Sequence, residues 1–250
     1  MVSRVRAELR KLLGLPTAWV GLVLGTLTAP AIVLLNAPYT RRAIAAGTLT
    51  DTSDLGLRDL GVGLIGPMVL GVIAVSSEYT STSQHAPGAR QLTATLTAVP
   101  DRLRLLVAKT AALVLVVAAQ AAVAATATLG LTQVLHGDHV PAPAPARVAG
   151  AILYWTLTAL LAYAITLITR NGIVPLTLLV INSTVVSVSY LLTKITDLAS
   201  YLPDIAGAQM FIRDADFPVE IAPLTAGLVM TAWVAVLLAI GAVLFQRRDA

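Results

Sequence analysis

Cysteine is absent from this 250-residue chain, and charged and aromatic residues are scarce. Without cysteine the chain has no disulfide framework and no thiolate metal site. Charged residues make up 12% of the sequence, about half of the roughly 25% that soluble domains carry, while 57% of the residues are hydrophobic. Aromatic residues make up 5% and do not alternate with basic ones, so nucleic-acid binding is not indicated. This composition points to a membrane protein.

The motifs of several enzyme classes are also missing. The sequence has no G-x-x-x-x-G-K-[ST] segment, so the chain cannot bind ATP through a P-loop of its own. It lacks a nucleophile elbow, a zinc-binding helix motif and a paired-carboxylate site. We therefore expect a protein that is not an enzyme and holds no cofactor in this chain.

One loop contains the residues that come closest to a metal site. His136, Asp138 and His139 stand in the segment HGDHVPAPAPAR. They lack a fixed helical spacing and a fourth ligand, so a solvated loop is the favoured interpretation. The Pro-Ala run after them is typical of a stiff, extended connector. We expect no metal site.

The chain contains six long apolar stretches that are free of Asp, Glu, Lys and Arg. A bilayer-spanning helix needs about 20 mostly apolar residues, and each stretch has that length. The first stretch follows several arginines, but it is too long for the apolar core of a signal peptide. We predict an all-α membrane protein with six transmembrane helices, at residues 15–37, 60–77, 107–135, 148–169, 172–193 and 221–246.

The distribution of basic residues predicts the orientation of these helices. With six spans both termini share one side, and that side carries eleven of the 17 basic residues and four of the 13 acidic ones. Loops rich in Lys and Arg stay in the cytoplasm. We therefore place both termini and residues 78–105 in the cytoplasm, and the protein in a bacterial plasma membrane.

Three segments outside these spans have patterns of their own. Residues 1–14 form an amphipathic helix, which suits the membrane interface beside anionic headgroups, or which serves only as a topology anchor. Residues 194–220 are too polar to span and too apolar for a free loop, so we predict short re-entrant helices on the outer side. Between the fourth and fifth spans, Asn171 or Gly172 can adopt the left-handed turn, and Pro175 is tolerated in the next first turn.

Polar residues inside the charge-free stretches, the third of which covers residues 110–137, are neutral, unless His136 at the edge of the third is counted. Proton- and ion-coupled transporters commonly keep ionisable relays in the membrane, so an energy source in a partner protein is favoured here. Packing between helices is the favoured role of the neutral polar residues, and substrate lining is the alternative. The candidate substrate-lining residues are Gln120, Asn182, Ser183 and Ser187.

The cytoplasmic segment 78–105 is amphipathic and basic. Pro87 and Gly88 interrupt it, and Leu92, Leu96 and Val99 then recur at the spacing of one helical stripe. We interpret the segment as an elbow, a short helix on the membrane surface and a re-entry into the third span. A solvated basic loop is the alternative, because positive-inside charge alone accounts for its arginines.

Residues 76–109 contain SSEYTSTSQ and LTATLTAVPDRLRLLVAK, which resemble the segment after the second span of ABC transporter permeases of the type-2 exporter class. Thr82 and Ser83 stand where that family commonly has Gly-Thr. RAELRKLLGLPTAW, YLPDIAGAQMF and LFQRRDA are similar to the family's interface helix, extracellular segment and C-terminal ending. The matching residues of the first segment are Ser76, Ser77, Glu78, Tyr79, Ala98, Val99, Pro100, Arg102, Ala108 and Lys109.

The resemblance implies an exporter subunit that pairs with a second copy of itself or with a sister permease. Each permease is then driven by a separate cytoplasmic P-loop ATPase, which binds the ATP and Mg²⁺. Glu78 and Tyr79 would brace the elbow of the coupling region. The alternatives are a secondary transporter and a non-transporting membrane scaffold. The residues that the resemblance assigns to contact with the ATPase are Arg90, Leu92, Leu96, Val99, Arg102 and Arg104.

Overall fold

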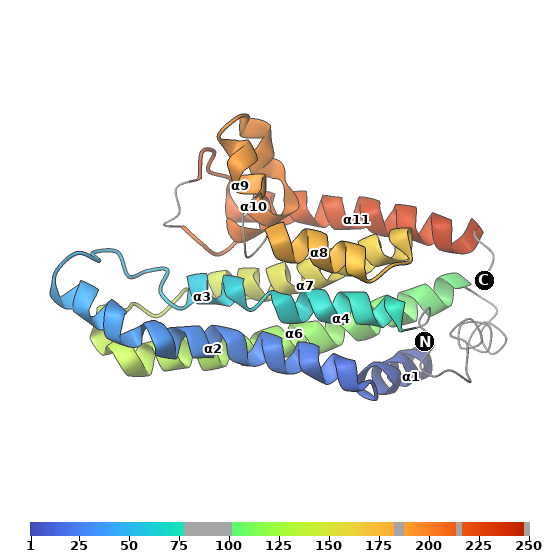
Figure 1. The fold of residues 1–250 in the computed structure, drawn as a ribbon, viewed down its shortest axis with the longest axis horizontal. Coiled ribbons are helices and arrows are strands. Elements are labelled where there is room, and N and C mark those ends of the chain that lie inside the picture. The colour runs from blue at the N-terminus through green and yellow to red at the C-terminus, as the bar shows by residue number, and fades with distance from the viewer. Residues whose placement is uncertain (78–101, 183–187, 214–216, 248–250) are drawn as a thin grey trace.

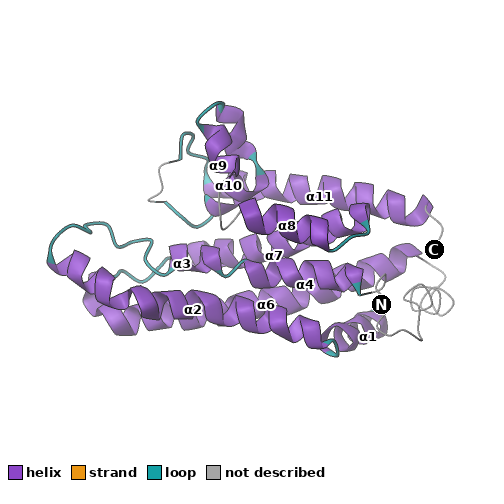
Figure 2. Ribbon diagram, in the orientation of Figure 1, coloured by secondary structure: helices purple, strands orange, loops and turns teal. Residues whose placement is uncertain are grey.

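The computed structural model describes residues 1–77, 102–182, 188–213 and 217–247. Within them the chain forms helices and loops and no β-strand, as Figures 1 and 2 show, which confirms the predicted all-α class. The longer helices run roughly side by side along the long axis of the molecule. Their bounds are α1 Val2–Leu13, α2 Pro16–Ala45, α3 Leu57–Val62, α4 Ile65–Ser76, α6 Arg102–His136, α7 Pro145–Thr169, α8 Ile173–Val180, α9 Val188–Thr193, α10 Pro203–Ala208 and α11 Pro223–Arg247, with the short 3₁₀ helices η1 Gly137–His139 and η3 Asp197–Tyr201.

Five helical stretches in the described part of the chain are long and apolar enough to cross a membrane, which supports a multi-pass membrane protein. They match five of the six predicted spans, and the second is broken at Gly63 and Leu64 between α3 and α4. Residues 172–193, the predicted fifth span, contain α8 and α9, each too short to cross a bilayer alone. The five stretches are Pro16–Ala45, Leu57–Ser76, Leu103–His136, Pro145–Thr169 and Pro223–Arg247.

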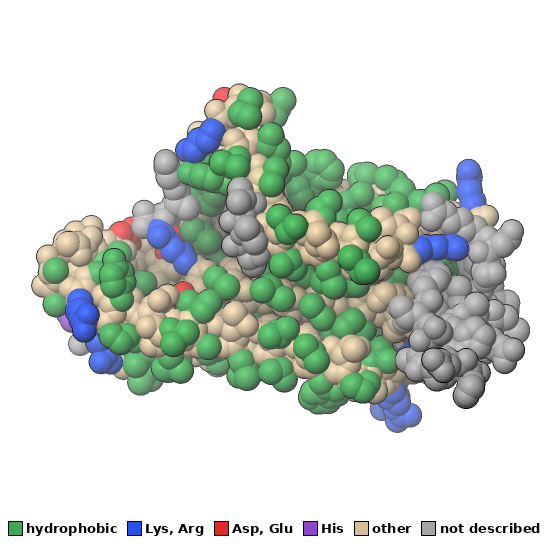
Figure 3. Space-filling view, viewed as in Figure 1, with side chains coloured by type: hydrophobic (Ala, Val, Ile, Leu, Met, Phe, Trp, Pro, Cys, Tyr) green, Lys and Arg blue, Asp and Glu red, His purple; other side chains and the backbone are tan. Residues whose placement is uncertain are grey.

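Helix α7 is the centre of the bundle. In its most apolar window 78% of the residues are buried, against 28% in α2 and 22% in α11. It packs against α4, α6, α8 and α11, with Trp155 and Tyr163 among its fully buried side chains. The indole N–H of Trp155 donates to the carbonyl oxygen of Leu60 at 3.1 Å, which ties α7 to α3. The apolar faces of α2 and α11 point outward, and Figure 3 shows apolar side chains along the middle of the molecule, with most charged ones toward its ends.

Glycine lets α2 and α4 cross with their backbones in contact. A Cβ added at Gly66 would overlap the Cα of Gly25, and one at Gly21 would lie 3.2 Å from side chains of α4. Gly21 and Gly25, in the first predicted span, therefore allow close contact between α2 and α4 of the same chain. Small residues at helix crossings are typical of membrane proteins, where dispersion contacts replace the hydrophobic effect between helices.

The turn between α7 and α8 differs from the sequence prediction. Arg170 itself adopts the left-handed conformation, with φ 52°, and its N–H donates to the carbonyl of Thr166 at 2.8 Å. Gly172 has φ −77°, so the prediction of Asn171 or Gly172 for this turn was wrong. The side-chain oxygen of Asn171 instead accepts the N–H of Ile173 at 2.8 Å and starts α8. Pro175 lies in the first turn of α8, as predicted.

The helices place two sets of connections at opposite ends of the bundle. Helix α1, the end of α4 at Ser76, the start of α6 at Arg102 and the end of α11 lie at one end, called here the α1 end (Figure 1). The end of α2, the loop 46–56, the end of α6 and the start of α7 lie at the other, called here the loop end.

Replacing Gly66 by alanine is expected to destabilise the bundle. The new methyl group has to push apart two backbones that are already in contact, and overpacking of this kind costs about 1–3 kcal/mol. Thermal unfolding in detergent measures the loss. The matched control is Gly130→Ala in α6, where an added Cβ meets nothing within 4 Å. Equal melting temperatures for the two variants would contradict the crossing.

Candidate functional site

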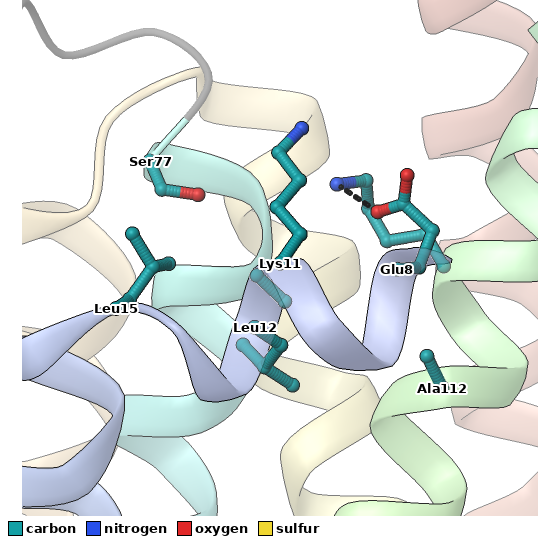
Figure 4. A pocket seen from close by; sticks show the side chains of 8 residues that line it. Glu8, Lys11, Leu12, Leu15, Ser77 and Ala112 are labelled. Carbon is teal, nitrogen blue, oxygen red and sulfur yellow. Dashed lines mark ion pairs between the residues drawn. The ribbon is translucent and has the colours of Figure 1, made fainter. Parts of the chain in front are cut away.

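The α1 end holds a small pocket between three helices, shown in Figure 4. Its walls come from Glu8, Leu12 and Leu15 near α1, Ser77 just after α4, and Lys109 on α6, among others. The cavity volume is about 10 Å³, which is the room of a single water molecule. The pocket is therefore a joint between helices and not a substrate cavity.

An ion pair connects α1 and α6 at this pocket. Lys109 Nζ lies 3.0 Å from Glu8 Oε2, and both residues are buried. Leu12, one turn after Glu8, is buried in the same core. The corner between α1 and α2 is fixed by Trp19, whose indole N–H donates to the carbonyl of Leu13 at 2.9 Å. Helix α1 thus packs against α6, and the ion pair between Glu8 and Lys109 joins the two helices.

The start of α6 includes the last two residues of the predicted ATPase contact. Arg102 is the first residue of α6, and Arg104 lies in its first turn with an exposed side chain. The remaining predicted residues of this region lie outside the described residues: Glu78, Tyr79, Arg90, Leu92, Leu96 and Val99. The described residues bring both flanks of the segment, Ser77 and the first turns of α6, to the α1 end.

The structure places Gln120 at the crossing of α2 and α4. Its Nε2 donates to the carbonyl oxygens of Gly21 and Leu22, each at 3.0 Å, and the side chain is buried. Its Oε1 has no hydrogen-bond partner among the described residues. These contacts favour helix packing as the role of Gln120, the interpretation preferred from the sequence.

Asn182 lies elsewhere, just after α8. Its Nδ2 donates to Asp204 Oδ2 at 2.8 Å and to Ser189 Oγ at 3.2 Å. The structure therefore does not bring Gln120 and Asn182 together into one lining. Ser183 and Ser187, the other two candidate lining residues, lie outside the described residues.

A buried charge network at the loop end was missed by the sequence analysis. Arg147, at the start of α7, pairs with the carboxylate of Asp54 and donates to the carbonyls of Ser53 at 2.9 Å and Phe211 at 2.8 Å. The other carboxylate oxygen of Asp54 accepts the backbone N–H of Arg213 at 2.9 Å. Three segments far apart in sequence meet here: the loop before α3, the start of α7 and the chain after α10.

His136 is the last residue of α6, and Asp138 and His139 belong to the short helix η1, so the prediction of a solvated loop at these residues was wrong. Within the described residues no group of three His, Cys, Asp or Glu side chains is placed to hold a metal ion. The carbonyl oxygen of His139 accepts a hydrogen bond from the hydroxyl of Thr52 at 2.6 Å, so η1 contacts the loop before α3.

Comparison with known proteins adds no family to this description: no family model, no curated protein and no solved structure matches the chain. The site is defined by its own contacts alone.

Replacing Glu8 by glutamine is expected to release α1 from α6. The buried Lys109 loses the carboxylate next to it, and removing one partner of a buried ion pair costs about 3 kcal/mol. Because the chain has no cysteine, the release can be measured by maleimide labelling of a single cysteine at Leu12, which is 6% exposed. Glu8→Gln should speed this labelling severalfold.

A cysteine at Leu13, which is 38% exposed, is the control and should react at the same rate in both backgrounds. The charge-exchanged double variant Glu8→Lys with Lys109→Glu should restore slow labelling at Leu12. Fast labelling of Leu12→Cys in the unaltered background would show that α1 is not docked as described.

Replacing Arg147 by lysine is expected to destabilise the loop end. An ammonium group cannot reproduce the three directions in which the guanidinium donates, so buried acceptors lose partners at a cost of roughly 2–4 kcal/mol. Arg58→Lys is the matched control, because Arg58 also faces Asp54, at 3.9 Å, but its side chain is 50% exposed. Thermal unfolding should separate the two variants, and similar losses would contradict the central role of Arg147.

Proposed function

We propose that the chain is the membrane-spanning subunit of an ATP-driven exporter in the plasma membrane. It works as a dimer with separate cytoplasmic P-loop ATPase subunits, and it moves a small molecule, peptide or lipid-like substrate outward. Both termini lie in the cytoplasm, and residues 172–193 complete a sixth span. Helices η3 and α10 belong to an outer segment that enters the membrane, and α1 lies in the membrane interface.

The observation that carries this proposal is the joint at the α1 end. Ser77 and Lys109 line the same small pocket as Glu8, and Arg102 is two helical turns before Lys109. The described residues on either side of segment 78–101 therefore lie at the end of α4 and the start of α6, and Ser77 and Lys109 contact the pocket beside α1. A force applied to that segment would pass directly into α1, α4 and α6.

Charge and motif content support the same conclusion. The segments that the positive-inside rule assigns to the cytoplasm carry eleven of the 17 basic residues, and ATP is available on that side. The chain has no P-loop sequence, so ATP hydrolysis requires a partner. The resemblance of residues 76–109 to the coupling region of type-2 ABC exporters names the class of that partner.

Deleting residues 84–99 is expected to abolish capture of a P-loop ATPase while the protein still inserts into the membrane. The test is purification of the tagged chain from cross-linked native membranes, followed by identification of the proteins retained with it. The deletion removes the amphipathic stripe of Leu92, Leu96 and Val99, which is the predicted contact.

The matched control changes the other side of the protein. Residues 141–144, the Pro-Ala connector at the loop end, are replaced by Gly and Ser, and this variant should retain the ATPase fully. Capture of an ATPase by the deletion variant would overturn the coupling assignment. Failure of the intact chain to capture any P-loop ATPase would overturn the exporter proposal.

A further inference from the structure

Packing against the bundle uses only part of the apolar stripe of α1. Leu12 is buried in the core, and Leu9 packs against that core. Glu8 and Leu12 line the pocket that α1 shares with α4 and α6 (Figure 4). On another side of the helix Val2 is 83% exposed and Leu13 is 38% exposed. One edge of the stripe is therefore left uncovered by the described residues.

Two arginines continue this uncovered edge. Figure 1 shows α1 at the edge of the bundle, beside the start of α2. The spacing i, i+4, i+8 and i+11 is that of one face of a helix. It brings together four residues whose side chains are exposed, called here the outer face of α1: Val2, Arg6, Arg10 and Leu13. The structure thus separates Arg6 and Arg10 from Lys11, which lines the pocket on the inner side.

The outer face carries positive charge that no other residue of α1 neutralises. Glu8 is the one acidic residue of α1, and its carboxylate lies 3.0 Å from Lys109 Nζ on α6. In the described part of the chain no acidic side chain forms an ion pair with Arg6 or Arg10. The pair between Glu8 and Lys109 therefore leaves the outer face purely cationic, which complements an anionic surface.

Trp19 indicates the depth of the outer face in a membrane. It lies in the first turn of α2, its side chain is 56% exposed, and its indole N–H donates to the carbonyl of Leu13 at 2.9 Å. Further along α2 the exposed side chains of Val20 and Val23 are apolar. Tryptophan is enriched where the hydrocarbon core meets the headgroups. Helix α1 joins this corner on the side away from the apolar part of α2, so its outer face lies at the level of the lipid phosphates.

We propose that the outer face of α1 binds anionic phospholipids of the bilayer. Arg6 and Arg10 contact the phosphate groups, since guanidinium groups donate paired hydrogen bonds to phosphate oxygens. Val2 and Leu13 lie against the upper acyl chains. A helix that served only as a topology anchor would need positive charge but no selection among lipids. The inference rests on the proposed function, for which it names a lipid partner at the end that would receive work from ATP.

The test uses Trp19 as a reporter of the lipids around it. The full chain is reconstituted into mixed vesicles of phosphatidylglycerol and phosphatidylcholine, with bromine on the acyl chains of one lipid at a time, and quenching of tryptophan fluorescence is measured. A Trp233→Phe background removes the other exposed tryptophan, and Trp155 is fully buried. We expect phosphatidylglycerol to be preferred at Trp19 by about threefold or more, because basic residues at an anionic surface attract its lipids.

Replacing both arginines of the outer face tests their role. Arg6→Gln with Arg10→Gln should abolish the preference for phosphatidylglycerol. Arg6→Lys with Arg10→Lys should retain most of it, because the two charges remain. The matched control is Arg41→Gln with Arg42→Gln, which removes the same charge at the loop end and should leave quenching of Trp19 unchanged.

Equal quenching by the two lipids in the chain with both arginines overturns the proposal, whether or not the variants fold. A preference that persists in the glutamine variant overturns it as well. If lipid preference is absent and the glutamine variant loses capture of the ATPase, the outer face binds an acidic surface of that partner instead. Capture of the ATPase is measured separately, so failure of the lipid test leaves the exporter proposal standing.

Discussion

Close backbone approach at glycine is the constraint on which the bundle depends. Helices surrounded by lipid gain no hydrophobic energy by associating, so they need short distances and a few hydrogen bonds. Gly66 meets Gly25 between α2 and α4, and a Cβ at Gly71 would overlap the carbonyl oxygen of Ala159 on α7. Gln120 then bonds from α6 to the carbonyls exposed at the first crossing. Helices α2, α4, α6 and α7 are thereby fixed as a unit, and both ends of the protein are built on it.

Charge is used at the two ends of this unit in the same way. Glu8 and Lys109 fix the amphipathic helix α1 to α6 at one end, and Asp54 and Arg147 fix the chain after α10 to α7 at the other. A buried ion pair contributes little net stability, but removing one of its two partners is strongly destabilising. Each pair therefore specifies which segments pack together. In the proposed exporter these two ion pairs would help to transmit a movement from the α1 end to the loop end.

The sequence predicted the helical class and the five long apolar stretches, because a run of about 20 residues without charge is rare outside membrane-spanning helices. It did not predict which residues meet. Glu8 and Lys109 are far apart in the chain, and no local spacing links them. The predicted turn was wrong at Arg170 because tertiary packing can impose a left-handed conformation that propensity assigns to Gly or Asn. Residues 78–101, where the family resemblance is strongest, stay a prediction.

The central claim is that work from ATP enters the membrane subunit at the α1 end. The most direct measurement is the rate of maleimide labelling of a single cysteine at Leu12, in membranes that contain the captured ATPase, with and without trapping by ATP and vanadate. The account predicts that trapping changes this rate severalfold, because movement of the coupling segment displaces α1. An unchanged rate, with the ATPase shown to be trapped, would contradict it.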